Sequence, residues 1–179
     1  VRFGERVCSP IIDKGEADII LAFELLEAYR ALPWLKEGGK LIVNNQKINP
    51  MPVIIGAAEY PQDLLAEMAA KNLDVDAIDA LSLAESAGSS KAVNIVLMGH
   101  LSRYFDFTEA EWLEALEQSV APKFLEMNKK AFALGVIRQD GVKMNNLQLF
   151  VRTLLGQFTL ETMIPVYIVL MILWGTIGI

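Results

Sequence analysis

Short apolar runs alternate with helix-like stretches along residues 1–137. The nearly continuous apolar run at 17–23 predicts a buried strand of a parallel sheet whose two faces are both covered. Apolar residues at helical spacing predict a helix over 24–32, which Pro33 limits, and a second strand is expected at 40–44. Strands and helices that alternate in this way are typical of an α/β domain.

The rest of this region predicts one more clear strand and then a series of helices. Alternating residues favour a strand at 75–80, and the long apolar helix expected at 92–105, with Gly99 inside it, indicates burial against another element. Thr108 and Glu111 form a capping box at the start of a further helix. The remaining expected elements are a turn at Gly38-Gly39, a short strand at 53–55, a helix opened by Pro61, a helix at 81–87 that ends at Gly88, and a helix from Pro122 with Phe124 inside and Gly135 as its C′ residue.

The N-terminus has the pattern of a hairpin. Residues 1–3 and 6–8 flank Gly4 and Glu5, and a glycine at the first turn position fits a type II′ turn. The chain starts without an initiator Met and without the apolar core of a signal peptide. A sequence that begins in mid-pattern is expected to be a fragment.

Charge disappears toward the C-terminus. The turn-like stretch Gln139-Asp140-Gly141 marks the change in composition, and 145–161 has the spacing of an amphipathic helix. Residues 162–179 carry no charge, and as an unbroken helix they would be about 27 Å long, close to the roughly 30 Å of a bilayer core. We therefore expect membrane association through 162–179, with the preceding domain in the cytoplasm. A buried core or oligomer helix and a foreign segment joined by a sequencing or gene-model error are the alternatives.

Composition narrows the classes of function. The chain is 53% hydrophobic and 21% charged, which excludes a disordered or low-complexity protein. Sixteen Lys and Arg against 22 Asp and Glu give a net charge of −6 and no basic patch, which disfavours nucleic acid as a partner. With one cysteine, the chain can form no internal disulfide and cannot by itself supply the four thiolates of an iron–sulfur cluster.

No catalytic constellation stands out. The sequence lacks the glycine-rich, P-loop, zinc-protease and nucleophile-elbow motifs, and we assign it no catalytic and no metal-ligating residue. Cys8 is interpreted as an ordinary strand residue and His100 as a structural or surface histidine. The acidic pair Asp74 and Asp76 is interpreted as a solvated strand end.

Two loops are candidates for a binding role. Asn45 and Gln46 follow Asn44 at the end of a predicted strand, where ligands bind in open α/β sheets. The alternative is a turn whose amides satisfy the local backbone. Hydroxyls, free backbone N–H groups and a lysine at a helix N-terminus can hold an anion, and simple serine capping is the alternative there. The members of this second loop are Ser89, Ser90, Lys91 and Asn94.

Several segments together resemble one known family. They are residues 1–10, 15–24, 41–50, 88–99 and 124–128. The segments resemble the gamma-type domain of 2-oxoacid:ferredoxin oxidoreductases, including the beta subunit of the two-subunit indolepyruvate type. It is a whole-domain likeness over 1–137 without a diagnostic catalytic signature, and His100 stands where a small residue is expected.

The resemblance implies a Rossmann-like or flavodoxin-like three-layer domain at 1–137. The hydrophobic helical tail expected at 138–179 matches nothing in the family. The family's first β-α-β unit, with its G-x-G-G-Q-G loop, is missing from this sequence. We therefore expect an incomplete sheet, with a group of packed helices at its C-terminal end, in which the strands at 17–23 and 40–44 each lack a partner on one side.

The resemblance also implies a role. The chain is expected to be an accessory subunit, inactive alone, of a cytoplasmic enzyme that oxidatively decarboxylates a 2-oxoacid to an acyl-CoA. Thiamine diphosphate and iron–sulfur clusters are expected on a catalytic alpha subunit, with coenzyme A as cosubstrate and ferredoxin as electron acceptor. The residues of the two candidate loops are expected to contact either a ligand or the partner subunit; they are Asn45, Gln46, Ser89, Ser90, Lys91 and Asn94. A stand-alone domain that binds coenzyme A or a nucleotide-like ligand and a membrane-tethered scaffold are the alternatives.

Overall fold

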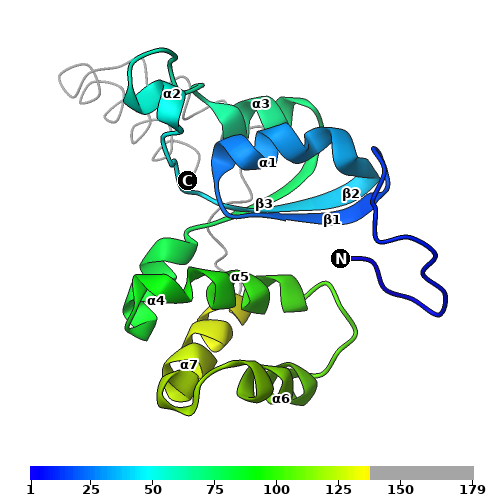
Figure 1. Cartoon of the computed structure of the whole chain (residues 1–179), viewed down its shortest axis with the longest axis vertical. Helices are drawn as coiled ribbons and strands as arrows, with labels where there is room; N and C mark the ends of the chain where they lie inside the picture. The colour runs from blue at the N-terminus through cyan, green and yellow to red at the C-terminus, as the bar shows by residue number, and fades with distance from the viewer. Residues whose placement is uncertain (138–179) are drawn as a thin grey trace, which may run out of the picture. The chain divides into compact units, whose positions relative to one another are not determined.

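A three-stranded parallel sheet organises the described part of the chain, residues 1–137 of a computed structural model. The strands are β1 (Ala17–Ala22), β2 (Leu35–Asn44) and β3 (Asp74–Ile78), in the order β1-β2-β3 (Figure 1). β2 pairs with both neighbours, so the expectation that strand 40–44 lacks a partner on one side is wrong. β1 has one neighbour among the described strands, as expected for it.

Helices lie on both faces of the sheet. Figure 1 shows α1 and α3 over one face and the helices α4 to α7 beyond the other. Three short 3-10 turns, η1 to η3, join these elements. The helices are α1 (Leu25–Ala31), α2 (Met51–Ile54), α3 (Leu64–Ala70), α4 (Ala80–Ala87), α5 (Val93–Ser102), α6 (Glu109–Ser119) and α7 (Leu125–Val136), and the turns are η1 (Leu32–Trp34), η2 (Ser90–Ala92) and η3 (Pro122–Phe124).

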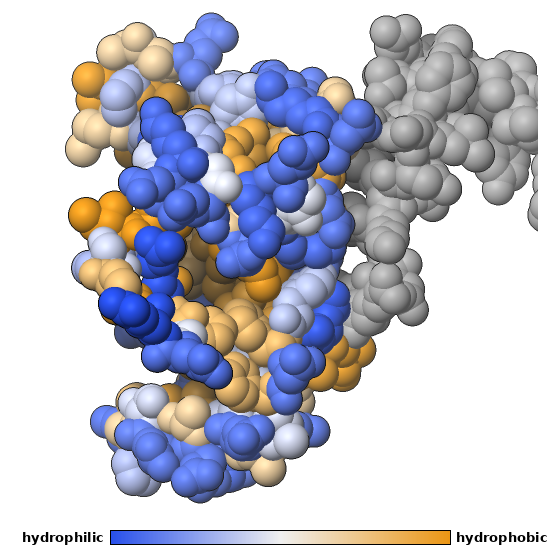
Figure 2. Space-filling model, turned by 90° about the vertical axis from the view of Figure 1, so that its right-hand side faces the viewer, coloured by the Kyte–Doolittle hydropathy of each residue, from blue (hydrophilic) through white to orange (hydrophobic). Residues whose placement is uncertain are grey.

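The alternation of side chains along β2 divides the core in two. Leu41 and Val43 are fully buried and pack in a cluster with Leu26 of α1 and Met68 of α3. The opposite face of the sheet contributes Ile78 to a second cluster, which the helices α4 to α7 complete. Seen from the side in Figure 2, apolar surface gathers in the zone between these two halves of the molecule.

Two glycines allow the C-terminal helices to pack closely. Gly99 of α5 and Gly135 of α7 lie where the two helices meet, and each faces the backbone of the other helix. A Cβ on Gly99 would lie 2.1 Å from the Phe132 carbonyl oxygen, and one on Gly135 would lie 2.0 Å from the Val96 oxygen. The expected burial of the Gly99 helix is confirmed. Gly135, in contrast, is a packing residue inside α7 and not a C′ residue.

Other local expectations hold. The capping box is present, with Thr108 Oγ1 accepting from the Glu111 N–H and the Glu111 carboxylate accepting from the Thr108 N–H. The helix predicted at 81–87 is α4, and Gly88 follows it in a left-handed conformation with a φ of 124°. One helix start differs: the helix expected to open at Pro61 begins at Leu64 with Asp63 as its N-cap, so Pro61 is not its first residue.

The expected N-terminal hairpin is not formed. Residues 1–8 contain no strand, and Cys8 is an exposed loop residue. A two-stranded hairpin alone is only marginally stable in water, and residues of this segment make other contacts instead. The Phe3 ring lies 5.9 Å from that of Phe105, and Arg2 donates a hydrogen bond of 2.5 Å to the Ile11 carbonyl.

Three further expectations are wrong for local reasons. Residues 53–55 belong to α2 and the turn after it, because Pro52 near the helix start pre-sets the dihedral angle of a first turn. Gly38-Gly39 lies inside β2, beside an irregularity in its pairing with β1, and makes no turn before the strand. Phe124 ends the turn η3 and is exposed, because the side chains that enter the core from this region come from the following helix, α7.

The segments expected to associate with a membrane lie outside the described residues. Within residues 1–137 no helix has both the length and the apolar character to cross a bilayer. The segment 162–179, the amphipathic helix expected at 145–161 and the boundary at Gln139-Asp140-Gly141 all lie outside the described residues.

We predict that Gly99→Ala and Gly135→Ala each lower the free energy of unfolding by at least about 1–3 kcal/mol, because the added methyl group would overlap a backbone carbonyl. Urea denaturation of the full chain measures the effect. Ala133→Leu, on the exposed face of α7, is the control: it adds more volume without a collision and should change stability little. Equal stability of all three variants would contradict the role of this helix crossing.

Candidate functional site

Asn44 ends β2 at the carboxyl edge of the sheet and is fully buried. Its Nδ2 donates to the Phe23 carbonyl at 3.1 Å and to Gln46 Oε1 at 3.0 Å, and its Oδ1 accepts from the Ala80 N–H at 3.1 Å. These bonds join the ends of β1 and β2 to the first residue of α4. Asn44 therefore acts as a structural connector between distant segments, whereas the expected alternative to a binding role is bonding to the local backbone.

The two predicted residues beside Asn44 differ in how far they are exposed to solvent. Gln46 is half-buried, and its carbonyl accepts from the Leu25 N–H at 3.1 Å. The Asn45 N–H donates to the Ile78 carbonyl at 2.8 Å, so its backbone continues the pairing with β3 while its side chain is exposed. Of the three amides, Asn45 is the one whose side chain points into solvent.

A buried carboxylate lies next to this loop and was not predicted from the sequence. Glu24 is 5% exposed and caps α1, with Oε2 accepting from the Glu27 N–H at 2.9 Å. Its other oxygen accepts from the Ile48 N–H at 3.2 Å and from the Tyr60 hydroxyl. Burial, together with the hydrogen bond to Glu24 and its negative charge, raises the pKa of Tyr60 to about 12. The phenol is thus a donor throughout the physiological range.

The second predicted loop is a capped turn. Ser89 Oγ accepts from the Lys91 N–H at 3.2 Å and caps η2, which is the simple serine cap foreseen as an alternative. Ser90, Lys91 and Asn94 are exposed. Their side chains are therefore available to a ligand or to another protein.

The structure keeps the two predicted loops apart. Asn44 bonds to the first residue of α4, whereas Ser89 follows its C-cap, Gly88. The eight residues of α4 span about 12 Å at 1.5 Å per residue. The two loops are therefore separate surfaces at opposite ends of one helix.

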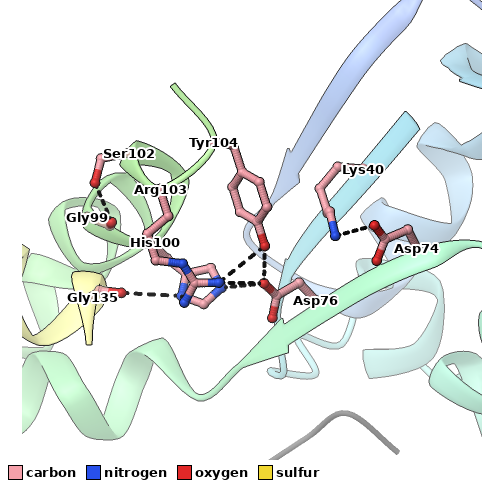
Figure 3. A network of polar contacts seen from close by, with 9 residues as sticks. All are labelled: Lys40, Asp74, Asp76, Gly99, His100, Ser102, Arg103, Tyr104 and Gly135. Atoms are coloured by element: carbon pink, nitrogen blue, oxygen red, sulfur yellow. Dashed lines mark hydrogen bonds and ion pairs between the residues drawn. The ribbon is translucent and has the colours of Figure 1, made fainter. Parts of the chain in front are cut away.

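A polar network joins the sheet to the C-terminal helices (Figure 3). Asp76 of β3 lies at its centre: Oδ2 is 3.0 Å from His100 Nε2 and 3.0 Å from Arg103 Nη2, and it accepts a hydrogen bond from the Tyr104 hydroxyl. The His100 Nδ1 lies 3.3 Å from the Gly135 carbonyl oxygen, so the ring connects α7 to the sheet.

The charge of Asp76 is strongly stabilised. Burial alone would raise the pKa of this carboxyl, but the hydrogen bonds from His100 and Tyr104 and the positive charge of Arg103 outweigh it and hold the pKa well below its usual range. Burial and the neighbouring Asp76 raise the pKa of Tyr104 to about 12. The interpretation of Asp76 as a solvated strand end is wrong, and that of His100 as a structural histidine is confirmed, since the ring is buried between two partners.

Lys40 and Asp74 extend the polar face of the sheet. They form an ion pair between β2 and β3, and the Lys40 Nζ lies 5.1 Å from the centre of the Tyr104 ring. Every charged group of this network has a charged or hydrogen-bonding partner within it. Among the described residues no group of three metal-ligating side chains is assembled, and this network works as an internal connection.

Fold and site together define an α/β domain whose buried polar groups serve its own architecture. Comparison with known proteins then assigns the family: a model of the pyruvate ferredoxin/flavodoxin oxidoreductase family matches residues 1–137. The chain belongs to this family, as the sequence resemblance indicated.

Two curated relatives are similar over the same region. The indolepyruvate oxidoreductase subunit IorB of Thermococcus kodakarensis is 41% identical over 144 residues, and that of Pyrococcus horikoshii is 38% identical over 144 residues. In both comparisons the match covers 76% of this chain and 70% of the relative.

A solved structure shares the fold. The gamma subunit of a keto/oxoacid ferredoxin oxidoreductase from Geobacter sulfurreducens matches with a TM-score of 0.50 and 24% identity, over 70% of this chain and 65% of that subunit. The chain thus spans slightly less than two thirds of that subunit's length. At this level of identity the match shows a common fold alone.

We predict that Asp76→Asn lowers stability by about 2 kcal/mol at pH 7, because it removes the charge that three donors surround. The pKa of Asp76 is lower in the folded chain than its unfolded value near 3.9. Its contribution is therefore complete above about pH 5 and is lost as pH falls below the unfolded pKa.

Urea denaturation at pH 7 and pH 3 measures this difference. The gap between wild type and Asp76→Asn should narrow at pH 3. Asp74→Asn, on the same strand and more exposed, is the control and should have a small effect at pH 7. A gap of equal size at both pH values would contradict the assignment of the charge to Asp76.

Proposed function

We propose that this chain is the accessory subunit of a thiamine-diphosphate-dependent 2-oxoacid ferredoxin oxidoreductase of the indolepyruvate type. The observation that carries the proposal is the family match over 1–137 together with the IorB relatives at 41% and 38% identity. The enzyme oxidatively decarboxylates its 2-oxoacid to an acyl-CoA and carbon dioxide, and the electrons pass to ferredoxin.

The cofactors belong, in this proposal, to a catalytic alpha subunit. The chain's one cysteine cannot provide the four thiolates of an iron–sulfur cluster. Its buried carboxylate Glu24 and its half-buried carboxylate Asp76 both accept from donors of the chain itself. The role of this chain is therefore to complete and close a site whose thiamine diphosphate and iron–sulfur clusters lie on the partner. The chain alone is inactive, and the complex is placed in the cytoplasm.

The finer fold assignment is part of the same proposal. Helices on both faces of a parallel sheet fit a Rossmann-like or flavodoxin-like three-layer domain. β1 and β3 each have one neighbour among the described strands, and we assign a further β-α-β unit to the β1 edge of the sheet. We assign the domain to 1–137 and the hydrophobic tail to 138–179.

Residues of the two loops are the proposed contacts with a ligand or with the partner subunit. At the carboxyl edge these are Asn45 and Gln46. Beyond the far end of α4 they are Ser89, Ser90, Lys91 and Asn94. Coenzyme A, which carries phosphates, is the anionic ligand that the lysine loop would meet.

Co-expression tests the proposed function. Tagged full-length chain, produced anaerobically with the catalytic alpha subunit, should elute with that subunit as an iron-containing complex that reduces ferredoxin when given indolepyruvate and coenzyme A. A chain that elutes alone from this co-expression would contradict the proposal. If coenzyme A then raised its unfolding midpoint, the result would favour a stand-alone ligand-binding domain.

We predict that Lys91→Glu in this complex raises the KM for coenzyme A or weakens subunit association at least several-fold, because it reverses the charge at an exposed helix start. Lys123→Glu, an equally simple charge reversal at the exposed turn η3, is the control and should leave both quantities unchanged. Normal assembly and turnover with coenzyme A in Lys91→Glu would show that the Ser89 loop is only a helix cap.

A further inference from the structure

His100 is the one histidine of the chain, and its ring lies between the sheet and the end of α7 (Figure 3). The side chain is 4% exposed, and each ring nitrogen faces an oxygen: Nε2 lies 3.0 Å from Asp76 Oδ2, and Nδ1 lies 3.3 Å from the Gly135 carbonyl oxygen. A carbonyl and an ionised carboxylate only accept hydrogen bonds, whereas a neutral imidazole has a single N–H. The ring therefore serves both oxygens only when it carries two protons and a positive charge.

The surroundings of the ring balance its charged and neutral forms. Asp76 favours the charged ring, because the pKa of this carboxyl is held well below its usual range and the group is ionised. The end of α7 favours it too: Gly135 lies in the last turn of this helix, where carbonyls lack donors within the helix and attract a cation. Burial of the ring and the neighbouring charge of Arg103 favour the neutral form.

A second partner lies beside the same ring nitrogen. Arg103 Nη1 is 3.4 Å from His100 Nδ1, and a guanidinium can only donate. Nδ1 with a proton therefore donates to Gly135, whereas Nδ1 without a proton accepts from Arg103. Arg103 is held in place for this role, because its Nη2 bonds to Asp76 at 3.0 Å and to the Tyr104 hydroxyl at 3.2 Å.

The other charged and titratable groups near the ring are paired or point elsewhere. Tyr104, with a pKa of about 12, and Asp76, with its lowered pKa, keep one protonation state near neutral pH. On the facing strands Lys40 pairs with Asp74, and Glu85 of α4 is exposed. The charged residues of α7 all lie in its first half, away from Gly135; they are Glu126, Lys129 and Lys130.

We propose that His100 is a pH-sensitive switch at the end of α7. The charged ring bridges the Gly135 carbonyl to Asp76 and so connects the end of this helix to the sheet. The neutral ring keeps its proton on Nε2, because that nitrogen faces the ionised Asp76, and its Nδ1 exchanges Gly135 for Arg103. Raising the pH therefore releases the end of α7 from the ring, and lowering the pH restores the bridge.

The single histidine makes the switch observable without any substitution. In the full chain labelled with nitrogen-15 and carbon-13, NMR spectra from about pH 5 to pH 9 cover the range in which histidines change charge. Both ring nitrogens should be protonated at the acidic end, and Nδ1 alone should lose its proton at the basic end. The Gly135 carbonyl signal should shift over the same interval. The Ala133 carbonyl, which accepts from the Ile137 N–H at 3.3 Å, is the internal control and should not follow the ring.

His100→Gln tests whether the ring causes the response. Its amide side chain does not titrate, so the pH-dependent shift of the Gly135 carbonyl should be lost. An unchanged circular dichroism spectrum shows that the variant is folded, and if it does not fold, the wild-type titration decides the question by itself.

Three results would overturn the proposal. A ring that keeps one charge state from pH 5 to pH 9 is no switch. A ring that titrates while the Gly135 carbonyl stays unchanged does not control the end of α7. A Gly135 shift that persists in folded His100→Gln belongs to another group.

Discussion

The close approach of α5 and α7 at Gly99 and Gly135 sets the geometry on which the helical half of the domain depends. Without side chains at these positions, α5 and α7 approach until each glycine faces a carbonyl of the other helix. The same approach brings the Gly135 carbonyl to His100 Nδ1, while the other ring nitrogen faces Asp76 on β3. The α5–α7 crossing, which leaves no room for a Cβ at either glycine, thus places the His100 ring where it can connect α7 to the sheet.

A buried carboxylate performs the equivalent task at the other end of the sheet. Glu24 accepts from the first turn of α1, from Ile48 and from Tyr60, and so ties a distant loop to the helix start. Both carboxylates, Glu24 and Asp76, join segments that are far apart in sequence. Because each is satisfied internally, removing a donor would leave a buried charge short of partners, which is costly. Both carboxylates therefore have a structural role, and their oxygens are already bonded to donors of the same chain.

The sequence predicts those elements whose cause is local. A capping box, a glycine after a helix and an apolar strand each depend on neighbouring residues. Thr108 and Gly88 act as expected, and a strand forms at each of the three main predicted positions, although β2 begins at Leu35, before the expected start. The errors have distant causes. Asp76 has the same local pattern as the exposed Asp74, and only the arrival of His100 and Arg103, about one helical turn apart at the end of α5, distinguishes the two. His100 and Arg103 are three residues apart and therefore share one face of α5, and this spacing is the local signal that favours an acidic partner.

The residues proposed to bind a ligand or a partner were harder to recognise from the sequence, for a related reason. A side chain that the fold does not use cannot be recognised by internal packing, and Asn45 or Lys91 differ from other polar surface residues only in where the sheet and α4 place them. Family membership gives these side chains a context, because the proposed accessory subunit would keep part of its surface for a partner. The polar groups of the interior bond to other groups of the same domain, while exposed amides and a lysine lie at the surface. This division fits the proposed accessory subunit, whose interior needs no other chain and whose surface offers polar side chains to one.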